Sequence, residues 1–415
     1  MKILEINVFH YRKGGSEAVY FSVSDLLREH GDKVINFALK WKENLPSAQS
    51  KYFPESKETR KGILRPIKNI VGYFYNHEAA KKLEELIEVE KPEIAQIHLI
   101  WGQITGSILP VLKRHHIPIV FTIHEYRIVC PAYTFRNGKG KVCEQCKGKY
   151  FYKCIQNKCC KDSYALSAMM AAEQYLRNWY TSPSKYADGI IYVSNFAKSK
   201  LEQYMPALKN RPNTVLYNLT DNFKSKDAIT KKNDKYFLFF GRLSYEKGIK
   251  TLITAFKETA LCRLKIAGTG PLETELKEFV KNNKMDNVEF LGYQSGKPLQ
   301  DLVSGAYFIM VPSEWYENNP MTIIEGYAEG VPAIGAEIGG IPEIIDNGRT
   351  GYLFESGNKK ELAEFVRKAN ELDDNTYLDF CRNALTFAKE HFDRKKYYPR
   401  LMNFFQEVKD KYDLQ

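Results

Sequence analysis

Two glutamates, Glu317 and Glu325, stand eight positions apart in the stretch SEWYENNPMTIIEGYAEGVP. Carboxylates accept hydrogen bonds from sugar hydroxyl groups, so this spacing is of chemical interest. Pro320 suits the first turn of a helix, and Asn319 is a good N-cap. The stretch therefore predicts a helix with Glu317 in the loop ahead of it and Glu325 in its second turn. A capped surface helix with scattered carboxylates is the plain alternative.

Two cations follow an apolar run in the segment FGRLSYEKGIKTL. Arg242 comes directly after the run, and Lys247 precedes a helical stretch. A guanidinium binds phosphate as a planar fork and a lysine binds it as a compact charge, so together they suit a diphosphate. Gly241 and the turn around Gly270 let the backbone pass close to a ligand. The alternative is a solvated loop.

A glycine pair, Gly14 and Gly15, lies directly after the first apolar run and before an amphipathic stretch. Glycines allow a close backbone approach, and a helix N-terminus at this point presents free N–H groups to an anion. The geometry of a tight turn explains the pair equally well.

Short apolar runs alternate with amphipathic helical stretches, which is typical of parallel sheets covered by helices on both faces. We predict an α/β protein of two doubly wound domains, residues 1–220 and 221–392, separated by a polar run near 220–234. Ligand is expected at the carboxyl ends of the strands. The predicted strands are 3–9, 33–39, 94–100, 118–123, 189–194, 214–217, 236–240, 263–267, 288–292, 308–312 and 333–335.

Composition and charge narrow the class of protein. The chain has 415 residues, 44% of them hydrophobic and 27% charged, and it contains no apolar run near the roughly 18 residues needed to cross a bilayer. Its start does not read as a secretion signal, so we expect a cytoplasmic protein. Residues 101–161 hold 11 basic and 2 acidic side chains, which favours a polyanionic partner: acidic lipid headgroups, nucleic acid or a phosphorylated substrate. A merely soluble basic face is the alternative. Without a known nucleic-acid-binding signature, nucleic acid is not expected.

Six of the eight cysteines fall between residues 130 and 160, within a basic, aromatic insert at about 125–165. Clustered cysteines in a reducing compartment more often bind zinc than form disulfides. We predict a structural zinc held by Cys143, Cys146, Cys154 and Cys159; free thiols or a disulfide are the alternatives. The next stretch, SYALSAMMAAEQYLRNWY, is expected to be helical and to pack its apolar side chains against this insert, with a lipid-facing role as the alternative.

Together these residues suit a nucleotide sugar. Glu317, Arg242 and Lys247 are expected to converge with a helix N-terminus at one mouth of the second sheet, because the carboxyl ends of parallel strands share one edge. Glu325 is then expected on the ribose, the two cations on the diphosphate, and Glu317 on the hexose.

The sequence resembles the retaining glycosyltransferases of family 4, which have the GT-B fold. The resemblance covers nearly the whole chain and rests on the E-x7-E pair, the G-R-x-x-x-x-K-G loop, the G-x-G-P turn and the amino-terminal glycine pair. It implies two Rossmann-like domains facing across a cleft, the first for acceptor and the second for donor. It also implies that a last helix, about residues 393–415, crosses back to the first domain.

The same resemblance implies a nucleoside-diphosphate-sugar donor, with a UDP-sugar favoured over a GDP-sugar, and no metal needed for catalysis. It implies a lipid-linked or glycan acceptor in cell-surface polysaccharide synthesis, at the inner face of the membrane. His124 in FTIHEY matches the histidine of this family that approaches the transferred sugar; His98 is a weaker candidate. The residues implied are His124, Glu317, Arg242 and Lys247 for catalysis, and Gly14, Gly15, Gly241, Arg242, Lys247, Gly270, Glu317, Asn318, Asn319, Pro320, Met321, Thr322 and Glu325 for donor binding.

Other classes of protein share parts of this pattern. The GT-B architecture also hosts sugar-nucleotide epimerases, and a non-catalytic sugar-nucleotide-binding protein needs the same cradle. A glycosidase needs two carboxyl groups flanking one bond, whereas here one glutamate is expected on the ribose.

Overall fold

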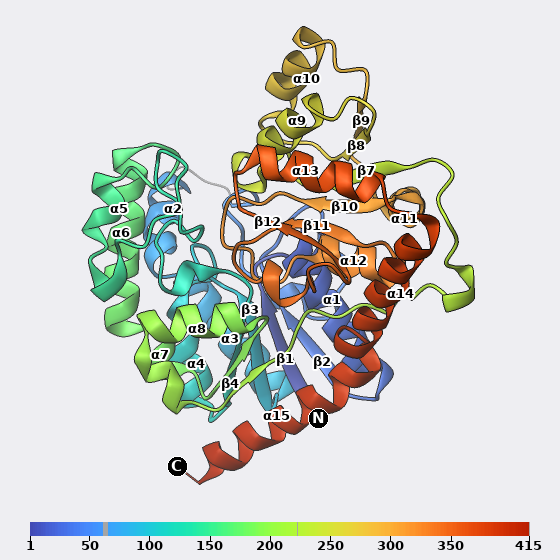
Figure 1. Cartoon of the computed structure of the whole chain (residues 1–415). Coiled ribbons are helices and arrows are strands. Elements are labelled where there is room, and N and C mark those ends of the chain that lie inside the picture. The colour runs from blue at the N-terminus through green and yellow to red at the C-terminus, as the bar shows by residue number, and fades with distance from the viewer. Residues whose placement is uncertain (61–64, 222, 415) are drawn as a thin grey trace. The chain divides into compact units, whose positions relative to one another are not determined.

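The computed structural model describes residues 1–60, 65–221 and 223–414. The chain forms two compact units, Met1–Leu216 with Tyr397–Gln415, and Tyr217–Lys396 (Figure 1). The polar run predicted to separate two domains begins a few residues after Leu216, where the chain first passes from one unit to the other. Asn222, within this run, lies outside the described residues. In the described part of the chain, no helix is long and apolar enough to cross a membrane.

The described first unit contains a six-stranded parallel sheet in the order β2-β1-β3-β4-β5-β6. Its strands are β1 (Lys2–Asn7), β2 (Lys33–Phe37), β3 (Ile94–Leu99), β4 (Ile119–Ile123), β5 (Gly189–Tyr192) and β6 (Asn213–Val215). Its helices are α1 (Gly15–Glu29), α2 (Arg65–Phe74), α3 (His77–Glu90), α4 (Leu109–Arg114), α5 (Tyr152–Gln156), α6 (Tyr164–Tyr180), α7 (Pro183–Tyr186) and α8 (Asn195–Tyr204).

The second unit, as far as it is described, repeats this plan with a parallel sheet in the order β12-β11-β10-β7-β8-β9. Its strands are β7 (Tyr236–Phe240), β8 (Arg263–Ala267), β9 (Val288–Gly292), β10 (Phe308–Val311), β11 (Ala333–Ala336) and β12 (Gly351–Phe354). Its helices are α9 (Ile249–Lys257), α10 (Glu273–Asn282), α11 (Gly296–Gly305), α12 (Met321–Ala328), α13 (Lys359–Asn370) and α14 (Asp374–His391).

The prediction of two doubly wound α/β domains is confirmed. Strands β7 and β10 are apolar at every position and fully buried, as expected for strands covered by helices on both faces. Strand β12 was not predicted. It is a four-residue edge strand, and its sequence GYLF is too short to show a period.

Each sheet has a point where the strand order reverses, and ligands of open α/β sheets bind there, beyond the carboxyl ends of the strands. In the first sheet this point lies between β1 and β3, and in the second it lies between β7 and β10. The glycine pair lies in the loop after β1, the two cations lie in the loop after β7, and Glu317 lies in the loop after β10.

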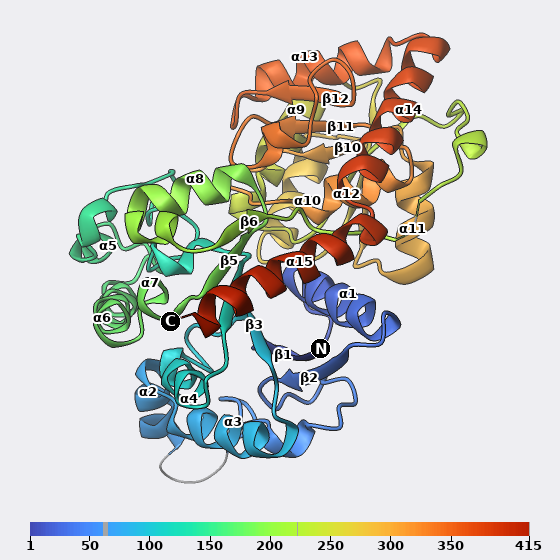
Figure 2. The ribbon, with the colours of Figure 1, turned by 90° about the horizontal axis from the view of Figure 1, so that it is seen from below.

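Helix α15 (Arg394–Asp413) returns to the first unit, as predicted (Figure 2). Its buried side chains are Tyr397, Leu401, Phe404, Phe405 and Val408. Gly189 at the start of β5 permits this packing, because a Cβ there would lie 2.5 Å from a methyl carbon of Val408. Tyr398 Oη donates to Asp32 at 2.9 Å, and Lys409 pairs with Glu93 at 3.0 Å.

Candidate functional site

In the second unit, the loops after β7 and β8 are fastened to each other. The Leu243 N–H donates to the Thr269 carbonyl at 3.0 Å, and the Leu272 N–H donates to the Leu243 carbonyl at 3.1 Å. Gly270 allows this approach, because a Cβ there would lie 2.3 Å from the Leu243 carbonyl oxygen. The exposed side chain of Arg242 therefore projects from a fixed backbone.

Lys247 and Glu317 form an ion pair across the switch point of the second sheet. Lys247 Nζ lies 2.7 Å from Glu317 Oε1, and Ser313 Oγ donates to the same oxygen at 2.7 Å. Only 6% of Glu317 is exposed. Burial raises the pKa of this carboxyl, but the charge and hydrogen bond of Lys247 and the bonds from neighbouring side chains outweigh it, so the pKa is lowered overall. Glu317 is thus held ionised.

Two glycines hold the loops that carry this pair. Gly248 has φ +65°, and a Cβ there would lie 1.8 Å from the Pro312 carbonyl oxygen. Gly339 has φ +64°, and a Cβ there would lie 2.4 Å from the carbonyl oxygen of Glu317. The next residue, Gly340, donates its N–H to that carbonyl at 2.7 Å. Both positions need glycine for backbone conformation as well as for space.

Helix α12 begins at Met321, with Pro320 rather than Asn319 at the N-cap position. The prediction of a side-chain cap from Asn319 is wrong, because its Oδ1 accepts the N–H of Asn218 at 2.8 Å and its carbonyl accepts from the Asn218 side chain. Asn319 thus fixes the loop rather than the helix. No side-chain cap takes up the first-turn N–H groups of α12 within the described structure. Apart from the Ile323 N–H, which donates to the Pro320 carbonyl at 3.2 Å, this helix N-terminus is suited to an anion.

Glu325 lies in the second turn of α12, as predicted, and is half-buried. Burial raises the pKa of its carboxyl to about 7. This glutamate therefore changes charge near neutral pH, in contrast to Glu317.

In the first unit, helix α1 begins at Gly15, with Gly14 as its N-cap. Gly14 has φ −167°, which any residue adopts, and a Cβ there would meet nothing nearer than Glu17 Oε2 at 3.5 Å. A tight turn therefore does not explain the glycine at position 14. Burial raises the pKa of Glu17, which sits in the first turn of α1.

His124 follows β4 and belongs to a chain of three side chains from adjacent strands. Glu5 Oε2 lies 2.8 Å from His98 Nε2, and His98 Nδ1 lies 2.9 Å from His124 Nε2. Glu5 on β1 and His98 on β3 are both buried. Burial raises the pKa of Glu5, lowers that of His98 to about 3, and, with the neighbouring His98, lowers that of His124 well below its usual value.

Because both imidazoles are neutral, their tautomers are linked. With an ionised Glu5, His98 donates from Nε2 to the carboxylate and accepts at Nδ1 from His124, so Nδ1 of His124 is an acceptor. With a protonated Glu5 the directions reverse, and Nδ1 of His124 is a donor. Sequence reasoning found His124, gave His98 less weight and missed Glu5, because the order β1-β3-β4 is what brings them together.

The predicted zinc site of Cys143, Cys146, Cys154 and Cys159 stays a prediction. Cys154 and Cys160 are buried with their sulfur atoms 4.0 Å apart, whereas Cys143, Cys146 and Cys159 are half-buried. Among the described residues, which include all of these, no group of three or more His, Cys, Asp or Glu is placed to hold a metal ion. Cys154 also forms a side-chain hydrogen bond with Cys159, so its thiol contacts two other cysteines, whereas a structural zinc takes four ligands around one point. Cys262 and Cys381 are buried in the second unit, as predicted.

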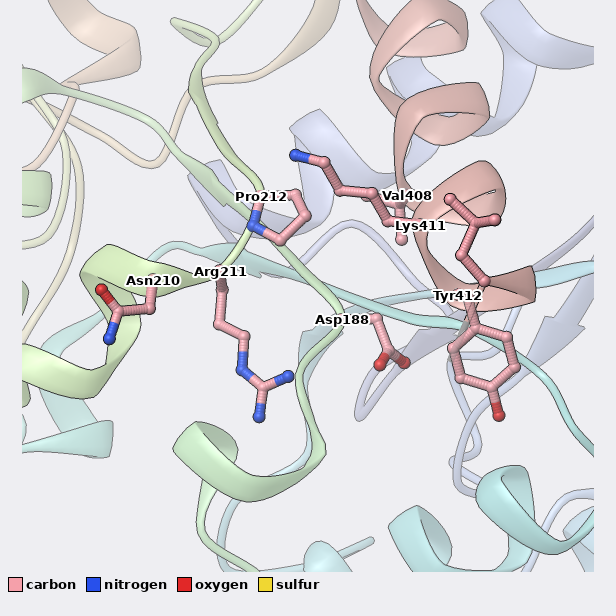
Figure 3. A pocket seen from close by; sticks show the side chains of 8 residues that line it. Asp188, Asn210, Arg211, Pro212, Val408, Lys411 and Tyr412 are labelled. Atoms are coloured by element: carbon pink, nitrogen blue, oxygen red, sulfur yellow. The ribbon is translucent and has the colours of Figure 1, made fainter.

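A pocket of about 250 Å³ lies at the opposite edge of the first sheet (Figure 3). It is lined by Asp188, which directly precedes β5, and by residues of α15 such as Tyr412. Lys113 lies 2.6 Å from both oxygens of Asp188, and the Ile119 N–H donates to one of them. Asp188 therefore fastens the sheet, and this pocket lies away from the residues described above.

The fold and this arrangement of cations and carboxylates define the class of GT-B glycosyltransferases. A family description, "Glycosyltransferase Family 4", matches residues 13–222, and a second, "Glycosyl transferases group 1", matches residues 221–387. The chain belongs to glycosyltransferase family 4.

Known proteins similar to this chain agree with that class. An uncharacterized glycosyltransferase of Methanocaldococcus jannaschii is 28% identical, over 83% of this chain and 84% of its own. A putative colanic acid biosynthesis glycosyltransferase of Salmonella typhimurium is 23% identical over 40% of this chain and 44% of its own. The crystal structure of Anabaena HepE in complex with UDP superposes with a TM-score of 0.63 at 18% identity, covering 98% of this chain and all of that one.

Proposed function

We propose that this glycosyltransferase moves a hexose-type sugar from a UDP-sugar to a lipid-linked or glycan acceptor, with retention at the anomeric carbon, in cell-surface polysaccharide synthesis. The second unit binds the donor and the first binds the acceptor. The protein works at the inner face of the membrane, docked on its anionic surface.

The ion pair of Lys247 with Glu317 carries this proposal, together with the exposed Arg242 on the same loop as Lys247. A buried carboxylate held ionised 2.7 Å from a lysine suits a hexose hydroxyl on one side and a phosphate on the other. Helix α12 adds its N-terminal N–H groups at the same switch point. Sugar and diphosphate are thereby bound side by side, with Glu325 placed for the ribose.

Transfer proceeds by breaking the bond between the anomeric carbon and the diphosphate oxygen while the acceptor oxygen bonds to the same face of that carbon. The acceptor hydroxyl proton passes to the departing diphosphate. Arg242, Lys247 and the α12 N–H groups meet the negative charge that grows on this leaving group, so the cations take the part that a divalent ion plays elsewhere. Glu317 orients the hexose through its hydroxyl groups.

The choice of donor and acceptor rests on similar proteins and on charge. HepE was crystallised with UDP and with UDP-glucose, and the Salmonella relative is named for colanic acid biosynthesis. The basic segment 101–161 is suited to an anionic membrane, where a lipid-linked acceptor is found.

Glu325→Gln is expected to remove a pH dependence from UDP binding. Because the pKa of Glu325 is raised to about 7, UDP affinity of the wild-type protein should increase as pH rises from 6 to 8, where the ionised carboxylate accepts a ribose hydroxyl. The variant should bind about tenfold more weakly at pH 8 and with little change between the two pH values. Titration calorimetry measures this; an equal pH dependence in the variant contradicts the assignment.

Glu5→Met is expected to lower kcat about tenfold through His124, because it removes the carboxyl that fixes the tautomers of both histidines. Glu5→Gln should keep most of the rate, since the raised pKa of Glu5 keeps this carboxyl protonated and the amide, like the acid, donates to His98 Nε2. KM for the donor should change little. Nitrogen NMR of the two imidazoles reports their tautomers directly. If Glu5 had a merely structural role, its substitution would leave these tautomers unchanged.

The matched control is Gln96→Met, since Gln96 is buried on β3 and bonds to Thr122 instead of to the histidines. Unchanged kcat in Glu5→Met, or an equal loss in the control, contradicts the role of the chain Glu5–His98–His124.

Incubation with a labelled UDP-sugar, with and without a lipid-linked acceptor, tests the proposed function. Transfer requires both substrates. A changed sugar without acceptor indicates an epimerase, and binding without product indicates a non-catalytic protein; either result overturns the proposal. A panel of nucleotide sugars screened for thermal stabilisation identifies the donor first, because a bound ligand raises the stability of the folded state.

A further inference from the structure

Helix α6 is polar on its buried side and apolar on its exposed side. Its buried residues are Ser167, Ala171, Glu173, Gln174 and Arg177, whereas the exposed ones include Tyr164, Leu166, Tyr175, Leu176 and Trp179. Trp179 is 74% exposed. Tyr175 packs its ring against Phe151 of the cysteine insert, as predicted, whereas Leu176 and Trp179 are exposed. A solvent-facing helix normally has the reverse pattern.

The polar side is explained by its contacts. Gln174 donates to the Ile128 carbonyl at 2.7 Å, and Arg177 donates to the Arg127 carbonyl at 2.7 Å. Arg177 also pairs with Glu173 at 2.9 Å, two buried charges that satisfy each other. These bonds fix the rotation of the helix about its axis. The apolar side of α6 therefore faces outward because the polar side is held by buried hydrogen bonds.

Further exposed apolar residues lie on the elements that pack against α6. Helices α2 and α5 pack against α6, and the three lie together in both views (Figures 1 and 2). Ile70 and Val71 of α2 are 59% and 53% exposed, and Tyr150 and Tyr152 are exposed at the start of α5. We call these residues, with the exposed residues of α6, the α6 face. Scattered exposed apolar residues are normal, but exposed apolar residues gathered on helices that pack together are typical of an interaction surface.

The charge beside this face is positive. Lys147, Lys149, Lys153, Lys158 and Lys161 lie on the segment that leads through α5 to α6. Residues 141–180 contain three acids, of which Glu173 is buried against Arg177 and Glu144 pairs with Lys200 at 2.7 Å. The remaining acid is Asp162. A helix that lies in a membrane interface typically has tryptophan and tyrosine on its apolar side and lysines next to that side.

We propose that the α6 face docks the protein on an anionic phospholipid bilayer, with Leu176 and Trp179 inserted at the level of the headgroups and the lysines on the lipid phosphates. This surface deepens the proposed function, on which it rests, by naming the part of the chain that meets the membrane. An acidic lipid surface is favoured over a second copy of the chain, because a copy would bring its own five lysines to the same place.

Co-flotation with vesicles tests the proposal. The full-length protein is mixed with vesicles of phosphatidylglycerol and phosphatidylcholine, and with vesicles of phosphatidylcholine alone. Leu176→Glu with Trp179→Glu should lower binding to the anionic vesicles about tenfold or more, because two inserted side chains are lost and two charges must be buried. Lys147→Gln with Lys149→Gln should lower it about fivefold per lysine and weaken its salt dependence.

The matched control is Leu261→Glu with Tyr293→Glu, which changes two apolar residues of the second unit that are 96% and 71% exposed. It should leave vesicle binding unchanged. Quenching of tryptophan fluorescence by brominated lipid should require Trp179, which Trp179→Phe removes while preserving binding.

The results that overturn the proposal are distinct from those that overturn the proposed function. Equal flotation of the wild-type and Leu176→Glu, Trp179→Glu proteins contradicts the α6 face, as does a wild-type dimer in sedimentation that this variant converts to a monomer. The Leu176→Glu, Trp179→Glu variant should still transfer sugar to a water-soluble acceptor. If this variant no longer floats with the vesicles but retains transfer, the result supports both the α6 face and the proposed function. If neither the wild type nor any variant transfers sugar, and only the Leu176→Glu, Trp179→Glu variant loses flotation, the proposed function is contradicted and the α6 face is supported.

Discussion

Arg242→Ala is expected to lower kcat/KM for glycosyl transfer by about a hundredfold or more, with little change in the free energy of unfolding. The guanidinium is exposed on a loop whose backbone is fastened by the Leu243 hydrogen bonds, so its removal leaves the packing intact. The loss arises because a preplaced cation opposite the leaving diphosphate is worth as much as one oxyanion donor.

Steady-state kinetics with donor and acceptor measure this effect, and urea denaturation checks the fold. Lys250→Ala is the matched control, since Lys250 is an exposed cation on α9 that pairs with Glu275. The variant Arg242→Lys should recover only part of the rate, because an ammonium lacks the planar fork. A rate within threefold of the wild type in Arg242→Ala would remove this arginine from the mechanism.

Lys247→Met is expected to impair transfer to a similar extent and, unlike Arg242→Ala, to destabilise the fold by about 2 kcal/mol. Glu317 is buried and keeps its charge through Lys247, so removing the lysine leaves a carboxylate with Ser313 Oγ but without its cation. The double variant Lys247→Met, Glu317→Gln should recover at least half of the lost stability, because the amide carries no charge, while transfer stays low.

The sign of the pH dependence follows from the lowered pKa of Glu317. A carboxyl whose pKa is lower in the folded state stabilises the fold at pH values above its unfolded pKa, near 4.5, and this stabilisation is lost as pH falls through the folded value. The stability difference between wild type and Lys247→Met should therefore shrink below about pH 4.5. Equal stability at pH 7, or recovery of transfer in the double variant, contradicts the role of the pair.

The main strands of both sheets were predictable because each is a short apolar run between glycines and helical stretches. The tract that contains Glu317 and Glu325 was predictable for a similar reason, since its carboxylates follow a strand and its proline starts a helix. The cap was not predictable, because Asn319 has a competing partner, Asn218, about a hundred residues away.

Long-range contacts also explain what the sequence concealed. Glu5 stands in the apolar run KILEIN and reads as an outward-facing position, yet it is buried against His98 from another strand. The exposure of Trp179 could not be predicted for the same reason. Hydrogen bonds from Gln174 and Arg177 to the backbone of residues 127–128 determine which side of α6 is buried.

The return of α15 bears on how the protein assembles as it is synthesised. The first unit is made first, yet five buried side chains of its outer layer come from the last helix, after the whole of the second unit has been translated. The later-made unit is continuous in sequence and has all its strands before residue 397, so it can complete its core on the ribosome. The earlier-made sheet must wait, with the surface around Gly189 uncovered, until α15 emerges.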